Sequence, residues 1–179
     1  MLKMFTVARR SILFTMVTGF MTLSALAAPA QASDPKLIST YGDWAAYTFE
    51  ENGNKVCYMA SKPTKAEGNY KVRGDIFVLV THRPAEKSKN VFSYIAGYTY
   101  KTNEEVTVMI DGKRFTLFAH KDMAWTSTAE TDTALSEALR KGSKMVVEGV
   151  SSRGTKTKDT FSLRGSGGAH DAINKACGY

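Results

Sequence analysis

Cysteine and proline are scarce in this sequence, which has two cysteines, Cys57 and Cys177, and four prolines among 179 residues. The cysteines do not form a C-x-x-C pair, and no cluster of Cys and His at metal-ligand spacing accompanies them. These absences argue against a redox-active dithiol and against a zinc site of the common kinds. We therefore expect no cofactor and no metal ion.

Signatures of catalysis are also missing. The histidines His82, His120 and His170 lie far apart with no H-E-x-x-H motif, so each is expected at the surface or at a rim. The Gly-Ser-Gly-Gly fragment at 165–168 is not the G-x-S-x-G elbow of a serine hydrolase, and a flexible linker is expected there. Paired carboxylates that meet only in space leave no motif and are not excluded. The sequence favours a protein that is not an enzyme.

Long apolar runs are absent except at the N-terminus. Residues 11–27 carry no charge, follow three basic residues and lead into the Ala-Gln-Ala of 30–32. This three-part pattern is that of a secretory signal peptide, so we predict that residues 1–32 are removed by cleavage after Ala32. The apolar run has 17 residues. An uncleaved membrane anchor is the less favoured alternative, because a span needs about 20.

A strong excess of one charge is missing as well. The net charge of the whole chain is +7, but three basic residues and no acidic ones belong to the predicted signal. Residues 33–179, which we expect to form a single domain, keep 21 basic and 17 acidic residues, a net charge of +4. So modest a charge on an exported chain argues against nucleic acid as a partner. We expect a periplasmic, outer-membrane-associated or secreted protein with no membrane span after cleavage.

Because we expect the chain to be exported, we interpret the two cysteines as a structural pair. In an oxidising compartment, two thiols in one small domain usually pair, so we predict a disulfide between Cys57 and Cys177. The bond would close a loop of about 120 residues. A loop of that length stabilises a fold by roughly 4–5 kcal/mol in the chain-entropy description.

Short alternating runs separated by turn residues dominate the rest of the chain. An Asp-Gly pair at 111–112, between two alternating runs, predicts a tight hairpin. Amphipathic spacing predicts two short helices at about 132–141, capped by Thr131 or Asp132, and 169–177. The strands are expected at 43–49, 56–60, 76–80, 91–100, 105–110, 115–119, 144–150 and 157–163. Because strands do not alternate with helices, this order favours a mainly β, two-sheet sandwich.

Two groups of side chains suggest a binding surface, each with a plainer interpretation. Three alternating tyrosines could form an aromatic binding face, but the plainer interpretation is that they belong to the buried core of a sandwich. A basic hairpin would suit anionic lipid or polysaccharide, but the plainer interpretation is a solvated loop. The candidate binding surface consists of Tyr94, Tyr98, Tyr100, Arg153, Lys156 and Lys158.

Several short motifs recur in an order typical of one family. They are Tyr41-Gly42-Asp43-Trp44, Cys57, Ala124-Trp125, Ala138-Leu139-Arg140-Lys141-Gly142, Val146-Val147-Glu148-Gly149, Phe161-Ser162-Leu163-Arg164-Gly165 and Cys177. In this the chain resembles the invasion-associated locus B family of small exported proteins, found chiefly in alphaproteobacteria. The resemblance implies an immunoglobulin-like β-sandwich and a periplasmic or surface-associated role. It supplies no catalytic residues.

The function expected from these observations is non-enzymatic binding of another envelope or host component, either a protein or a polysaccharide. Two alternatives remain open. One is a structural or stress-related envelope factor with no dedicated ligand, and the other is an unrecognised hydrolase with carboxylates assembled in a cleft.

Overall fold

The computed structural model describes residues 32–179, so the predicted signal peptide lies outside the described residues except for Ala32. These described residues form two α-helices, α1 (Ala129–Lys141) and α2 (Ser166–Cys177), and a short 3-10 turn, η1 (Pro84–Glu86). The strands are β1 (Lys36–Tyr41), β2 (Trp44–Glu51), β3 (Asn54–Ser61), β4 (Lys65–Gly68), β5 (Phe77–Arg83), β6 (Ser88–Ile95), β7 (Val106–Ile110), β8 (Lys113–His120), β9 (Met123–Trp125), β10 (Lys144–Val150) and β11 (Lys156–Ser162).

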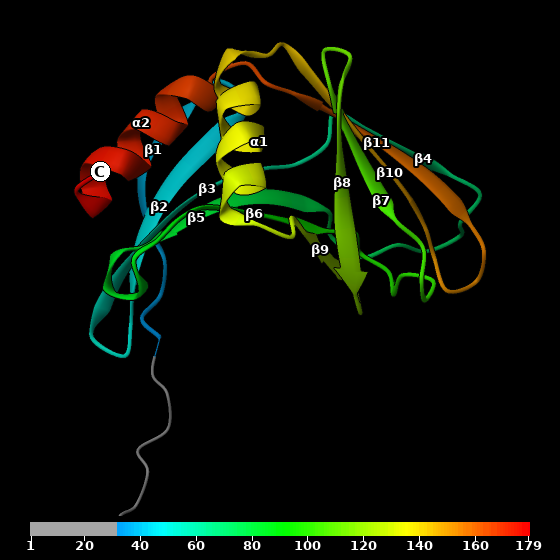
Figure 1. Ribbon diagram of the computed structural model, residues 1–179, viewed down its shortest axis with the longest axis horizontal. Coiled ribbons are helices and arrows are strands. Elements are labelled where there is room, and N and C mark those ends of the chain that lie inside the picture. Colours follow the sequence, from blue (N-terminus) through cyan, green and yellow to red (C-terminus); the bar gives the residue numbers. More distant parts are fainter. Residues whose placement is uncertain (1–31) are drawn as a thin grey trace, which may run out of the picture.

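The eleven strands form one antiparallel sheet in the order β1-β2-β3-β5-β6-β9-β8-β7-β10-β11-β4. This sheet bends at β9 and β8, so that the half made of β1, β2, β3, β5 and β6 faces the half made of β7, β10, β11 and β4 (Figure 1). The Nε1 of Trp44 on β2 donates a hydrogen bond to the carbonyl of Ser162 on β11 at 3.0 Å. The mainly β, sandwich-like fold with two helices is confirmed, with the two layers continuous through β9 and β8.

The core lies between the two halves and beneath the helices. Trp44, Phe92 and Tyr94 from one half and Phe161 from the other are all at most 1% exposed. The rings of Tyr94 and Phe161 meet edge to face with centroids 6.2 Å apart. Burial of these large aromatic side chains supplies much of the force that closes the sheet on itself.

Turns at Asp111-Gly112 and at Gly97 set where the preceding strands end. The Asp-Gly hairpin is present between β7 and β8, with positive φ at both Asp111 and Gly112. The predicted strand at 91–100 is too long, because β6 ends at Ile95. Gly97 takes a φ of 71°, and a Cβ there would lie 2.4 Å from the carbonyl oxygen of Gly74. The chain therefore leaves the sheet at this point and carries Tyr98 into a loop.

Both helices begin three residues before the predicted positions. Thr128, rather than Thr131 or Asp132, caps α1, and its side chain accepts the Thr131 N–H at 3.2 Å. The expected flexible linker at 165–168 is wrong, since α2 begins at Ser166. A Cβ on Gly168 would lie 2.8 Å from the ring of Tyr41, so that glycine permits close packing and does not act as a hinge.

The disulfide joins β3 to the end of α2. Cys57 and Cys177 are bonded as predicted, 120 residues apart in sequence. Both are buried, at 0% and 8% exposure.

Neither helix in the described part of the chain is long and apolar enough to cross a membrane.

His82 and His170 are not at a rim, contrary to expectation, but are buried side by side, at 0% and 2% exposure. Their ring centroids are 5.6 Å apart, and two asparagines connect them. The Asn90 N–H donates to His82 Nδ1, and His82 Nε2 donates to Asn174 Oδ1, both at 3.0 Å. Asn174 Nδ2 then donates to His170 Nδ1 at 3.0 Å, and His170 Nε2 to Asn90 Oδ1 at 2.9 Å. In this arrangement every ring nitrogen has a partner only while both histidines are neutral.

Acid is therefore expected to destabilise the fold through this pair. Burial lowers the pKa of His82, and burial with the nearby charges of His82 and Arg140 lowers the pKa of His170 to about 4. Because the unfolded chain binds more protons below pH 6.5, the stability present above that pH declines as the pH falls toward 4. The loss from His170 is about 3 kcal/mol, to be measured by urea unfolding across that range.

A His170→Gln variant is the matched control for this prediction. Glutamine retains a donor and an acceptor but does not titrate, so its stability should depend less on pH between 6.5 and 4. Carboxylates titrate in both proteins and cancel in the comparison. Identical pH profiles for the variant and the parent would contradict a role for His170.

Candidate functional site

A cavity of about 560 Å³ lies where three loops meet. Its walls come from residues 69–74 between β4 and β5, residues 97–99 after β6, and residues 151–157 at the turn into β11. We call it the Arg73 pocket, after the buried arginine that lines it. Its volume is within the range of small-ligand sites in proteins.

Backbone hydrogen bonds hold the three loops together. The Gly74 N–H donates to the Gly97 carbonyl at 2.9 Å, and the Ser152 N–H donates to the Thr99 carbonyl at 2.7 Å. These bonds place the loop that carries Arg73 beside the loop that carries Tyr98. The pocket is thus formed by chain segments that are distant in sequence.

Arg73 and Asp159 form a buried ion pair at the pocket, with side chains only 4% and 0% exposed. The contact is bidentate, with Nη1 2.8 Å from Oδ1 and Nη2 2.6 Å from Oδ2. The Nε of Arg73 also donates to the Ala96 carbonyl at 2.7 Å. This ion pair therefore ties the 69–74 loop to β11 and to the end of β6.

Tyr94 completes the polar contacts of Asp159, and its hydroxyl donates a hydrogen bond to Oδ2. Burial and the neighbouring negative charge of Asp159 raise the pKa of Tyr94. Burial opposes the charge of Arg73, but the hydrogen bonds and charge of Asp159 outweigh it and raise the arginine's pKa above its usual value. Arg73 stays charged and Tyr94 neutral near pH 7, so the group offers fixed donors and charges.

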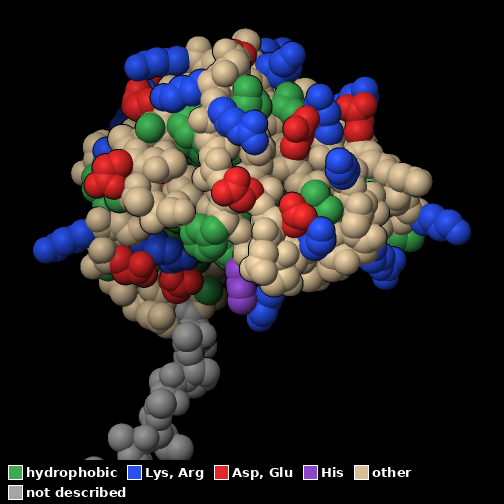
Figure 2. Space-filling view, turned by 45° about the vertical axis from the view of Figure 1, so that its right-hand side comes forward, with side chains coloured by type: hydrophobic (Ala, Val, Ile, Leu, Met, Phe, Trp, Pro, Cys, Tyr) green, Lys and Arg blue, Asp and Glu red, His purple; other side chains and the backbone are tan. Residues whose placement is uncertain are grey.

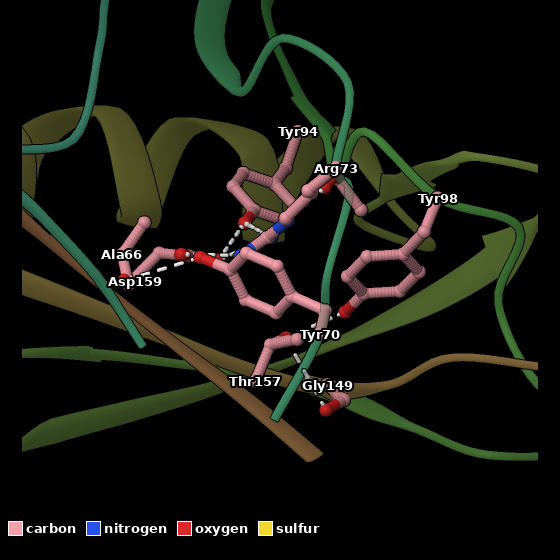
Figure 3. Close-up of polar contacts among 9 residues, drawn as sticks. Ala66, Tyr70, Arg73, Tyr94, Tyr98, Gly149, Thr157 and Asp159 are labelled. Carbon is pink, nitrogen blue, oxygen red and sulfur yellow. Dashed lines mark hydrogen bonds and ion pairs between the residues drawn. The ribbon is translucent and has the colours of Figure 1, made fainter. Parts of the chain in front are cut away.

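Two further tyrosines flank the guanidinium group. In Figure 3, Arg73 reaches toward Asp159 with the rings of Tyr70, Tyr94 and Tyr98 around it. The guanidinium carbon of Arg73 is 4.8 Å from the Tyr98 ring centroid and 5.4 Å from that of Tyr70. These are cation–π distances, and they fix the orientation of the two rings that line the pocket.

The open part of the pocket is positively charged. Lys71 and Arg153 line it, are exposed, and have no ion-pair partner among residues 32–179. No Asp or Glu from the described part of the chain belongs to its lining. On the face shown in Figure 2, basic and acidic side chains are interspersed. The Arg73 pocket therefore combines unpaired cations with tyrosine rings and hydroxyl groups.

The structure divides the predicted binding surface. Tyr94 and Tyr100 belong to the interior, at 1% and 5% exposure. Tyr98 and Arg153 meet in the Arg73 pocket, where the Tyr98 hydroxyl lies 2.6 Å from Thr157 Oγ1.

Lys156 and Lys158 point to the other side of β11. Residues on this strand alternate between exposed lysines and buried Thr157 and Asp159. The two lysines line a separate cavity of about 360 Å³ that also contains Glu148, whose Oε1 lies 3.5 Å from Lys158 Nζ. The structure therefore does not bring these two lysines together with Arg153.

Arg73, Asp159 and Tyr70 were not identified from the sequence. Arg73 and Tyr70 lie in a loop with no periodicity, so no sequence pattern indicates them. Asp159 did carry a signal, because it occupies an inward position between Thr157 and Phe161 on an alternating strand. A charged residue at such a position predicts a buried partner of opposite charge.

No group of three or more His, Cys, Asp or Glu within residues 32–179 is arranged to hold a metal ion. Neither curated proteins nor solved structures gave a significant match to the chain. The family model described as "Invasion associated locus B (IalB) protein" matches residues 44–174, and this family is not known as one of enzymes. The match spans both halves of the sheet and most of α2, so the chain belongs to the invasion associated locus B (IalB) protein family.

Proposed function

We propose that this chain is an exported, non-enzymatic protein of the bacterial envelope, periplasmic or associated with the outer membrane. It binds an acidic polysaccharide of the envelope or of a host through the Arg73 pocket. The family supports an invasion-associated bacterial role. The signal-like N-terminus supports export.

The composition of the pocket is the observation that supports an acidic polysaccharide as the ligand. Within residues 32–179, Lys71 and Arg153 are unpaired cations that suit carboxylate or sulfate groups, and no acidic residue of that range lines the cavity to repel them. Sugar rings stack on tyrosine faces, which Tyr70 and Tyr98 supply, and sugar hydroxyls bond to the serines and threonines of the 151–157 segment.

Titration calorimetry on the mature protein tests this proposal, with a short oligouronate as the acidic probe. We expect the oligouronate to bind and an uncharged malto-oligosaccharide of the same length to bind far more weakly. Replacing both cations, Lys71→Ala with Arg153→Ala, should weaken oligouronate binding by about tenfold or more, since two charge-assisted contacts are lost.

The matched control removes two other exposed lysines, Lys36→Ala with Lys55→Ala, on β1 and β3. Net charge changes by the same amount, so this variant should bind as the parent does. Equal weakening in both double variants would show non-specific attraction to a polyanion. No binding at all would favour a structural role without a dedicated ligand.

A further inference from the structure

A different cavity, separate from the Arg73 pocket, lies beside the end of β9. It measures about 490 Å³, and its walls are mainly apolar, with Val91, Phe118 and Trp125 among them. Phe118 on β8 and Trp125 on β9 are direct cross-strand partners, with ring centroids 5.7 Å apart and planes inclined by 30°. Phe118 is 50% exposed, so an aromatic wall faces solvent here.

One carboxylate lines this aromatic cavity. Asp132, in the first turn of α1, is 9% exposed. Its Oδ1 accepts hydrogen bonds from the Phe92 N–H and from Thr126 Oγ1, both at 2.7 Å. Its Oδ2 has no hydrogen-bond partner, and no cation pairs with Asp132, among residues 32–179. Burial raises the pKa of Asp132, because its charged form is poorly solvated there.

We propose that this cavity binds a small organic cation, an ammonium ion carrying methyl groups. The unpaired Oδ2 of Asp132 provides the opposite charge, and Phe118 and Trp125 contact the methyl groups. Aromatic faces attract such cations through their ring electrons, and a carboxylate that is only 9% exposed gains from a compensating charge.

The cavity offers few hydrogen-bond acceptors, and this indicates which substituents the ammonium carries. A primary ammonium carries three N–H donors and needs several acceptors, whereas beside the unoccupied oxygen of Asp132 the lining within residues 32–179 holds only Thr126 and His120 as polar side chains. A metal ion is a poorer match, because Ca²⁺ and Mg²⁺ require about six oxygen ligands and only one acidic residue among those described lines the cavity. A quaternary ammonium has no N–H to satisfy and presents apolar methyl groups to the rings.

The test is a titration of the mature protein with choline and with tetramethylammonium at pH 8, followed by calorimetry and by tryptophan fluorescence. Trp125 lines the cavity, so its emission should change as the site fills. We expect saturable binding of both cations. Uncharged dimethylbutanol, in which carbon replaces the choline nitrogen, should bind about tenfold or more weakly.

Two variants test the contributions of the carboxylate charge and of the aromatic rings to binding separately. Asp132→Asn keeps the acceptor for Phe92 and Thr126 but removes the charge, and it should lower choline affinity by about tenfold. Phe118→Ala removes an exposed ring and should have a similar effect. Leu37→Ala, which trims a side chain on β1 that is 57% exposed and lines neither cavity, is the control and should change nothing.

The outcomes that overturn the proposal are specific. Equal affinity for choline and dimethylbutanol would show that the cavity binds through apolar contacts alone. An Asp132→Asn variant that binds choline as the parent does would show that the carboxylate takes no part in binding. If Asp132→Asn does not fold, unchanged choline binding by Phe118→Ala decides against the proposal. Oligouronate binding should be the same in every variant of this site, so a failure here is distinguishable from a failure of the Arg73 pocket.

Discussion

Replacement of both Cys57 and Cys177 by alanine is expected to lower the free energy of unfolding by about 4–5 kcal/mol. The bond closes a loop of 120 residues, and its removal gives the unfolded chain the conformational freedom that the loop denies it. A loss of this size is comparable to the whole stability of many small domains. Urea unfolding of the variant and of the parent, with and without reductant, measures it.

Mass spectrometry of unreduced protein checks the premise of this prediction. Material recovered from the envelope should begin at Ser33 and weigh two hydrogens less than the free dithiol. Reductant should destabilise the parent and leave the double alanine variant unchanged. Two alkylatable cysteines in native, unreduced protein would contradict both the bond and the oxidising compartment that it implies.

Asp159→Asn is expected to lower the free energy of unfolding by about 3 kcal/mol or more, measured by urea unfolding at pH 7. Arg73 would remain buried without a compensating charge, and removal of one partner from a buried ion pair is far more costly than removal of an exposed one. Tyr94 would also lose its charged acceptor. The cost arises from desolvation of the arginine that is left, more than from the contact itself.

The same substitution in an exposed pair is the control. Asp75 lies 3.4 Å from Lys62, with side chains 78% and 63% exposed, so Asp75→Asn should change stability by less than about 1 kcal/mol. Combining Asp159→Leu with Arg73→Met should recover much of the loss, because neither charge then remains buried. Similar costs for Asp159→Asn and Asp75→Asn would show that Arg73 reaches solvent easily.

Local patterns in the sequence predicted the parts of the fold that depend on local geometry. The Asp111-Gly112 hairpin follows from the positive φ that such a turn requires, and the alternation in β11 follows from its two faces. The pairing of Cys57 with Cys177 needed only their number and an oxidising compartment. Each of these predictions rests on neighbouring residues or on a simple count.

The remaining features depend on contacts between distant segments. Nothing near Tyr98 shows that the chain leaves the sheet at Gly97, since the crossing with Gly74 causes it. Arg73 and Asp159 are 86 residues apart, and only the bent sheet brings them together. His82 and His170 looked peripheral because their asparagine partners come from other elements.

The covalent bond between β3 and α2 has a consequence for resistance to proteases. Residues 57–177 form a closed ring, and all three loops of the Arg73 pocket lie within it. A protease that cuts any one of these loops opens the ring but separates nothing, so both pieces remain one molecule. The protein can thus expose these loops to proteases without losing a fragment at the first cleavage.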